Sequence, residues 1–149
     1  MNAWIETSFD AARLDLAMIH RFLSGQSHWA RGISLERVRR AVAGSLCVGA
    51  YSGGAQIGFA RVVTDGATFG FLCDVFVLPE FRGRGVSHRL LDALFAHPDL
   101  LGLRRVALTS RDAGGLYARH GFAALSQPQI WMERHNPHVY ATSHEESTA

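Results

Sequence analysis

The chain has 149 residues, of which 48% are hydrophobic, and a formal net charge of +2. This length and composition predict one globular domain with a core of its own and exclude a disordered chain. The charge is too small to indicate nucleic-acid binding, the apolar runs are too short to span a bilayer, and the N-terminus lacks a signal pattern, so we expect a cytoplasmic protein without a membrane partner.

Hydrophobic periodicity divides the N-terminal half into a strand, two helices and a hairpin. The chain order is a strand at 4–7, an amphipathic helix at 11–23, a helix at 35–42 that Ser34 caps and Gly44 ends, and strands at 46–51 and 56–64. The turn between the last two strands is Ser52-Gly53-Gly54, which is typical of a hairpin. The first strands are therefore expected to be antiparallel.

The segment from Asp74 to Ser87, D-V-F-V-L-P-E-F-R-G-R-G-V-S, is the most informative part of the chain. An apolar strand at 68–77 is stopped by Pro79, and a basic glycine-rich turn leads into a helix at 86–96. A strand, a glycine-rich turn and a helix together point free backbone N–H groups at an anion, and the helix N-terminus adds positive charge. We therefore expect a phosphate-bearing cofactor at this turn.

The C-terminal part is expected to contain a strand at 105–109, a helix at 113–120, and a final pair of strands around Phe122 and at 130–133. Residues 136–149 are polar and are expected to be a mobile tail, which leaves a single domain at 1–135. The passage from 68 to 109 is long enough for a parallel crossover. The fold class is thus expected to be α+β, with a mixed, mostly antiparallel sheet and helices on both faces.

Two segments carry a resemblance to a known family. The turn follows the pattern R/Q-x-x-G-x-G/A at Arg82 and Gly85, with Ser87 in the last position, and resembles the acyl-CoA pyrophosphate loop of the GNAT superfamily of N-acetyltransferases. Further along, the family pattern A-x-x-L-Y-x-x-x-G-F is matched from Ala113 to Phe122. With both motifs in order, the resemblance covers residues 56–132, and upstream phrases look like a small bacterial branch of these enzymes without an assigned substrate.

The resemblance implies an enzyme that transfers an acetyl group from acetyl-CoA directly to an amine, in a domain that acts as an acyl-CoA N-acyltransferase. In this family the pantetheine arm pairs with strand N–H groups, which here belong to Phe76 and Val77, with Phe76 as the oxyanion donor. Ser110 stands where the family often has Asn. The pyrophosphate loop corresponds to Arg82, Gly83, Arg84, Gly85, Val86 and Ser87.

The same resemblance gives Tyr117 the role of the acid that protonates the departing thiolate, although a core tyrosine with a local hydrogen bond is the alternative. Asp74 is the candidate general base, directly or through water. It could instead pair with Arg61 or cap a turn. His28 and His120 are the other candidate bases, because imidazole titrates in the right range.

The acceptor is expected at the loop 27–31, through His28 and Trp29, with packing as the alternative role for the tryptophan. We expect a small amine acceptor and a monomer or homodimer. A protein N-terminus or lysine, an alcohol, and a non-catalytic acyl-CoA sensor on the same fold are the alternatives. Cys47 and Cys73 lie off the motif positions, which disfavours an acyl-enzyme, and no residue spacing indicates a metal site.

Overall fold

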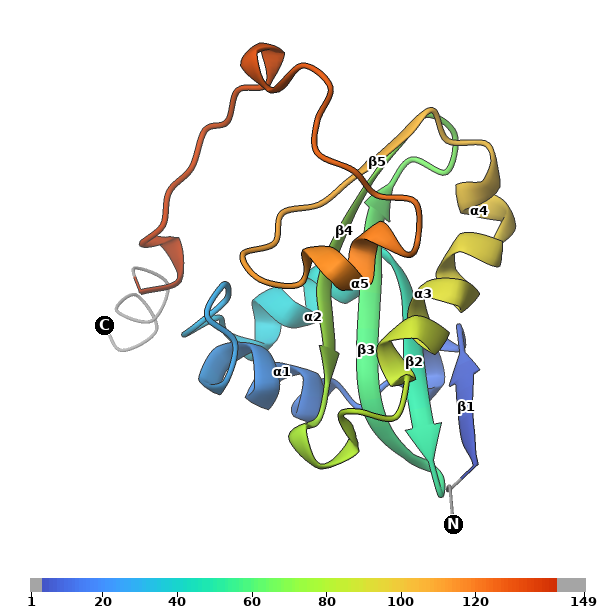
Figure 1. Cartoon of the computed structure of the whole chain (residues 1–149). Helices are drawn as coiled ribbons and strands as arrows, with labels where there is room; N and C mark the ends of the chain where they lie inside the picture. Colours follow the sequence, from blue (N-terminus) through green and yellow to red (C-terminus); the bar gives the residue numbers. More distant parts are fainter. Residues whose placement is uncertain (1–3, 142–149) are drawn as a thin grey trace.

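The described residues of the computed structural model, 4–141, build one central sheet with helices on both faces (Figure 1). The sheet has five strands in the order β1-β2-β3-β4-β5. Neighbouring strands are antiparallel except β4 and β5, which are parallel. This confirms the expected α+β fold with its mixed, mostly antiparallel sheet.

The elements lie close to the predicted ranges over the first hundred residues. The strands are β1 Ile5–Ser8, β2 Leu46–Ser52, β3 Ala55–Thr64, β4 Phe69–Val77 and β5 Arg105–Ala107. The α-helices are α1 Leu16–Gly25, α2 Leu35–Ala43, α3 Val86–Ala96, α4 Pro98–Leu101 and α5 Gly114–Ala118. Three 3₁₀ helices are η1 Ala11–Arg13, η2 Pro79–Phe81 and η3 Pro128–Ile130. Within the described residues, none of these helices has both the length and the apolar character that a bilayer crossing requires.

The sheet carries a separate apolar core on each face. On one face, α1 and α2 pack on the sheet through buried side chains such as Phe22, Phe59 and Phe76. On the other face, α3 buries Leu90 and Leu94 against strand residues such as Val62. The two cores thus hold α3 on one face of the sheet and α1 and α2 on the other.

The first predicted helix begins later than its apolar pattern indicates. Asp10 caps η1 by accepting a hydrogen bond from the Ala12 N–H, and Asp15 caps α1 by accepting one from the Met18 N–H. Two acidic caps in close succession split the expected helix 11–23 into a 3₁₀ turn and a shorter α-helix, because each cap defines a new helix start.

The expected final pair of strands is wrong. Residues around Phe122 and at 130–133 form no strand, and the chain between them contains η3. A strand needs a partner edge, but residues 123–138 are all exposed and β5 pairs with β4 alone in the described sheet. The outer edge of β5 is thus unpaired in the described sheet, and the β-like composition of Ile130 and Trp131 is not enough to bring this segment to it.

The C-terminal segment returns to the body at Tyr140, which packs against the α1–α2 core beneath the guanidinium of Arg37, 5.6 Å from its ring centre. The rest of the expected mobile tail, residues 142–149, lies outside the described residues. The domain boundary at 135 stays a prediction.

A bulge in β4 opens the sheet between β4 and β5. Asp74 has φ 54°, the one positive φ among described residues other than glycine, and the β3–β4 register shifts between Phe59 and Arg61. Bulges bend a strand and increase its twist. The β4–β5 pairing is accordingly confined to residues 69–71 of β4, and the remainder of that β4 edge runs free of β5.

Candidate active site

The glycine-rich loop begins at the end of β4 and delivers the chain into α3. Gly83 and Gly85 have φ of 77° and 75°, and Gly85 is the N-cap residue of α3. Side chains other than glycine rarely adopt this left-handed conformation. A Cβ at either position would meet no atom within 4 Å, so the space above the loop is open. This is the geometry in which backbone N–H groups can approach an anion closely.

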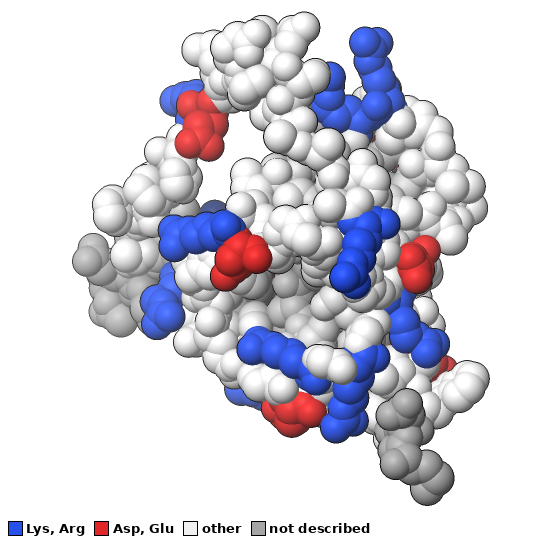
Figure 2. All heavy atoms as spheres, in the orientation of Figure 1, with Lys and Arg blue, Asp and Glu red and all other residues white. Residues whose placement is uncertain are grey.

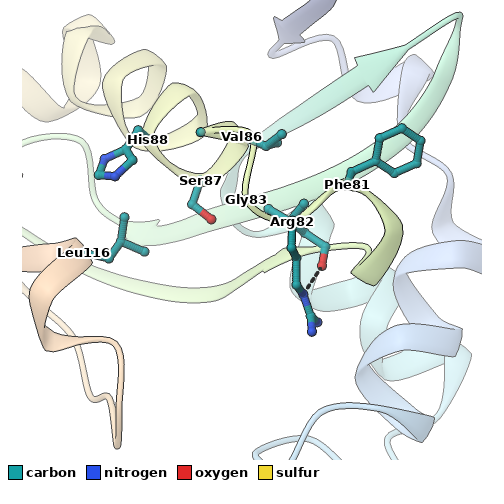
Figure 3. A pocket seen from close by; sticks show the side chains of 9 residues that line it. Phe81, Arg82, Gly83, Val86, Ser87, His88 and Leu116 are labelled. Atoms are coloured by element: carbon teal, nitrogen blue, oxygen red, sulfur yellow. Dashed lines mark hydrogen bonds between the residues drawn. The ribbon is translucent and has the colours of Figure 1, made fainter. Parts of the chain in front are cut away.

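The loop is tied to the strand by Arg82, whose Nε donates a 3.1 Å hydrogen bond to the Val77 carbonyl (Figure 3). Fixing the side chain in this way places a guanidinium at the mouth of the loop. Arg84 lies elsewhere, with its guanidinium 5.4 Å above the Phe81 ring. On the face shown in Figure 2, arginine side chains surround a central hollow, with fewer acidic side chains among them.

A cavity of about 320 Å³ lies between the loop, the first turn of α3 and α5. Figure 3 shows side chains from these elements around it, including Ser87, His88 and Leu116. Most of the residues predicted to bind the cofactor meet here. The lining comprises Val77, Phe81, Arg82, Gly83, Gly85, Val86, Ser87, His88 and Leu116. Three predicted cofactor residues, Phe76, Arg84 and Ser110, are not part of this lining.

The β3–β4 register determines which strand N–H groups face the open side. Leu78 N–H donates to the Ile57 carbonyl directly opposite, and Phe76 lies opposite Phe59. Hydrogen-bonded pairs recur every second residue, so the Phe76 N–H also points toward β3. Val77 pairs with Gly58 between these two hydrogen-bonded pairs, so its N–H points away from β3. The roles expected for Phe76 and Val77 at the donor stay predictions, and in this structure the two N–H groups point to opposite edges of β4.

Asp74 sits at the bulge with both carboxylate oxygens engaged. Oδ1 accepts a 2.7 Å hydrogen bond from Trp29 Nε1, and Oδ2 accepts one of 2.7 Å from Arg61 Nε. The Asp74 side chain is 8% exposed and that of Arg61 is 17% exposed. The arginine continues the network to Ser45 through Nη1 at 2.9 Å. Asp74 therefore forms the ion pair with Arg61 that the sequence analysis gave as the alternative to its role as a base.

Trp29 joins the predicted acceptor loop to this network. Trp29 is 44% exposed, and its indole lies edge-on to His28, with ring centres 5.0 Å apart. Beneath it, Phe22 stacks on Phe76 at 4.0 Å. The hydrogen bond to Asp74 therefore fixes an accessible aromatic surface beside the bulge of β4, where an acceptor would reach a thioester lying along the strand.

Tyr117, on α5, is half-buried with its ring edge-on to Phe122, 6.0 Å between ring centres. Burial raises the pKa of its phenol, and the nearby Asp112 raises it further. The hydroxyl therefore stays protonated over a wider pH range, as a proton donor requires. Tyr117 and Ser110 line another cavity, of about 400 Å³, beside β5. The Ser110 hydroxyl accepts the Ala113 N–H at 3.1 Å and caps the turn into α5.

A histidine pair at the first cavity was not predicted. His88 Nδ1 lies 2.9 Å from His120 Nε2, and His120 Nδ1 lies 3.5 Å from Asp92 Oδ1. On the far side, Arg119 approaches His88 Nε2 at 3.5 Å. The chain of contacts fixes the imidazole of His88 at the cavity wall. The spacing of His88 and Asp92 on one helix face was visible in the sequence, but the link to His120 spans 32 positions.

The two cysteines flank Arg61 in the sheet, Cys47 opposite it on β2 and Cys73 opposite it on β4, and neither lines the cavity. Burial raises the pKa of the Cys47 thiol to about 12 and that of Cys73 to about 11. Both are free thiols, and neither resembles an activated nucleophile, which needs a lowered pKa. Among the described residues, no group of three or more histidine, cysteine or acidic side chains could hold a metal ion.

Comparisons with known proteins agree with this geometry. The model of the Acetyltransferase (GNAT) domain matches residues 43–124. A Gibberella zeae protein named a "putative acetyltransferase" is 31% identical over 136 residues, covering 76% of this chain and 75% of that protein. A crystal structure from Xanthomonas campestris, described with the same words and as a GNAT family member, is 52% identical with a TM-score of 0.90, covering 93% of this chain and 97% of its own.

The fold is also similar to that of N-acetylglutamate synthase from Neisseria gonorrhoeae, solved with coenzyme A and L-arginine. That chain is 18% identical with a TM-score of 0.64, and the match covers 88% of this chain and 30% of that one. At this identity the likeness concerns the fold alone. The family match and the relatives more than 30% identical, taken with the loop, the cavity and the split between β4 and β5, establish that the chain is an N-acetyltransferase that belongs to the GNAT family.

Proposed function

We propose that the protein transfers an acetyl group from acetyl-CoA directly to the primary amine of a small molecule. The observation that carries this proposal is the position of the 320 Å³ cavity, which adjoins both the anion-binding loop and the free edge of β4. A donor whose pyrophosphate occupies the loop can extend its pantetheine arm along that edge. Its thioester then lies near the bulge at Asp74.

In this arrangement the loop and α3 bind the pyrophosphate. The left-handed Gly83 and Gly85 leave room for phosphate oxygens at the backbone, and the N-terminus of α3 contributes its partial positive charge. Arg82 adds a fixed guanidinium, and His88 lines the same wall. The Val77 N–H takes the pantetheine amide as an added strand would.

The chemistry is a single displacement. The amine nitrogen bonds to the thioester carbon, negative charge develops on the carbonyl oxygen, and the carbon–sulfur bond breaks. The attacking amine loses one proton to solvent as the carbon–nitrogen bond forms. Tyr117 gives its proton to the departing thiolate and regains one from solvent, so one proton leaves the amine and one ends on the sulfur. Cys47 is buried and Cys73 half-buried, and burial raises the pKa of both thiols, so neither is activated to take the acetyl group on the way.

Asp74 has two competing roles in this scheme. Its contacts with Trp29 and Arg61 support a positioning role, in which the carboxylate holds the acceptor loop against the bulge. The competing role is the base, which would take the amine proton through a water molecule. The acceptor itself meets His28 and Trp29, an exposed imidazole beside an aromatic surface, which suits a small amine better than a folded protein surface.

The test is a thiol-release assay of the full chain with acetyl-CoA and a panel of primary amines, amino acids, alcohols and peptides. Release of coenzyme A that depends on a small amine, with the N-acetyl product found by mass spectrometry, is expected. Turnover with alcohols would show an O-acetyltransferase, and turnover only with peptides would show a peptide or protein acceptor. Either result would contradict the proposed small-molecule amine acceptor. Saturable coenzyme A binding without turnover on any acceptor would favour the acyl-CoA sensor.

A further inference from the structure

Two histidines beside the anion-binding loop form a chain of contacts that the proposed chemistry does not use. His88 lies in the first turn of α3 and lines the cavity of about 320 Å³, and its Nδ1 is 2.9 Å from Nε2 of His120. The ring centres are 5.2 Å apart, so the two nitrogens lie between them, as a hydrogen bond between ring edges requires. Figure 3 shows His88 near Leu116 on one side of the cavity. The His120 side chain is 10% exposed, so the protein holds the pair in place.

The groups at the two ends of this chain determine which ring nitrogens carry hydrogen. Asp92 Oδ1 lies 3.5 Å from His120 Nδ1, and a carboxylate favours an N–H group at that position. At the other end, Arg119 Nη1 lies 3.5 Å from His88 Nε2. A guanidinium only donates hydrogen bonds, so it favours a ring nitrogen without hydrogen. The arrangement that satisfies all three contacts has two neutral imidazoles, each with its hydrogen on Nδ1.

The surroundings of the pair are more positive than negative. The loop, α3, and α5 with the two residues after it contribute these charged or titratable side chains: Arg82, Arg84, Arg89, Asp92, Tyr117 and Arg119. Among the described residues, Asp92 and Arg119 are those that contact a ring nitrogen of the pair. The Asp92 side chain is 73% exposed, so solvent screens its charge. A positive charge on His88 is therefore opposed as long as the cavity holds no anion.

We propose that His88 binds a pyrophosphate oxygen of the donor and takes up one proton as it does so, with His120 and Asp92 as positioning residues. The proton adds from solvent to His88 Nε2, while Nδ1 keeps its hydrogen bond to His120. The imidazolium then donates a charge-assisted hydrogen bond to the phosphate. Arg119 is exposed, so its guanidinium can turn from Nε2 toward the same anion. The proton returns to solvent when coenzyme A leaves.

The pair would make donor binding sensitive to pH, which the arginines of the site cannot do. A guanidinium such as that of Arg82 stays charged, whereas an ordinary imidazole changes its charge between about pH 5 and 8. Because binding takes up a proton, the affinity for the donor rises as the pH falls, by at most about tenfold per pH unit. This inference rests on the proposed binding of acetyl-CoA at the loop and adds the protonation of the pair to it.

The test is isothermal titration calorimetry of the full chain with dephospho-coenzyme A, in buffers that differ in ionisation enthalpy. This ligand keeps the pyrophosphate but lacks the phosphate monoester, whose own ionisation near pH about 6 would add to the signal. The slope of the observed enthalpy against the buffer enthalpy gives the number of protons taken up. We expect at least about half a proton at about pH 7.5, and an affinity at least about threefold higher at about pH 6.5 than at about pH 8.

Two variants of the pair and one control assign the proton. His88→Asn removes the ionising group and should abolish the uptake, and His120→Phe keeps a ring but no acceptor and should lower the uptake by at least about half. His97→Asn is the matched control and should keep the wild-type uptake. His97 also lies near an aspartate, Asp99 at 4.0 Å, but at the other end of α3, and asparagine keeps an oxygen that can cap α4.

The outcomes separate this inference from the proposed function. Saturable binding without proton uptake, or uptake that either variant of the pair retains in full, would overturn the inference and leave the proposed function standing. If dephospho-coenzyme A and acetyl-CoA both fail to bind the folded chain, the inference and the proposed function are both wrong.

A second measurement uses the wild-type chain and so does not depend on the folding of a variant. Long-range proton–nitrogen correlation NMR with labelled histidine shows which ring nitrogens carry hydrogen. At about pH 7.5, the free chain should show neutral His88 and His120 rings with hydrogen on Nδ1, and dephospho-coenzyme A should convert His88 to the imidazolium. Hydrogen on Nε2 of His120 in the free chain, or a neutral His88 in the complex, would overturn the proposal.

Discussion

Replacing Gly85 with alanine tests the anion-binding loop directly. Gly85 has φ 75° and a Cβ there would meet nothing within 4 Å, so the unliganded protein should fold. The cost of holding an L-residue in this conformation is about 1–2 kcal/mol. The loop of the free variant can relax to avoid this strain, but it must adopt the left-handed conformation again to bind the donor. The added methyl group also occupies space that the phosphate oxygens need. We therefore expect acetyl-CoA affinity to fall by at least tenfold, about 1.4 kcal/mol.

The assay is isothermal titration calorimetry of acetyl-CoA with each variant, after circular dichroism has shown that the fold is retained. Gly53→Ala is the matched control: Gly53 has φ 59°, its Cβ would also meet nothing within 4 Å, and it lies in the β2–β3 turn. It carries the same backbone strain without contacting the donor. If folded Gly85→Ala and Gly53→Ala bind acetyl-CoA with equal affinity, the loop does not bind the donor.

Tyr117→Phe should lower kcat on the order of 10²-fold while leaving acetyl-CoA affinity unchanged; an equal loss of affinity would assign the ring to packing. If Asp74 positions the loop, Asp74→Asn and Trp29→Phe should each raise the KM of the acceptor, and the double variant should be no worse than either single one; if it is the base, only Asp74→Asn should lower kcat and change the pH profile. Because burial raises the pKa of Cys47 to about 12, and of Cys73 to about 11, iodoacetamide should label these thiols slowly in the folded chain up to pH about 9 and rapidly in urea; rapid labelling of the folded chain would reopen the acyl-enzyme route.

Local patterns were enough to predict most of the fold. The hairpin at Gly53 and the helix at 86–96 follow from turn residues and apolar spacing within a few positions, and both formed as predicted. The strands expected near Phe122 and at 130–133 have strand-like composition, but whether a strand forms depends on an edge supplied by a distant part of the molecule. That information is not local, and the segment became an exposed arm instead.

In the candidate site, too, features built from consecutive residues could be predicted and features that join distant residues could not. The loop from Arg82 to Ser87 could be proposed from the sequence because its residues are consecutive, and most of them line one cavity. The partnership of Asp74 with Trp29 joins residues 45 positions apart, and the β4 bulge lies at the positive φ of a single residue, Asp74. Neither is visible in periodicity, which describes average strand geometry rather than its interruption.

The initial-velocity pattern of the acetyl transfer tests the central claim most directly. Rates would be measured with acetyl-CoA and the amine varied together, once an active amine is found. Direct transfer requires both substrates on the enzyme at once and predicts double-reciprocal lines that intersect, with no acetyl group on the intact protein by mass spectrometry. Parallel lines, together with an acetylated chain trapped in the absence of amine, would show a covalent intermediate and contradict the account.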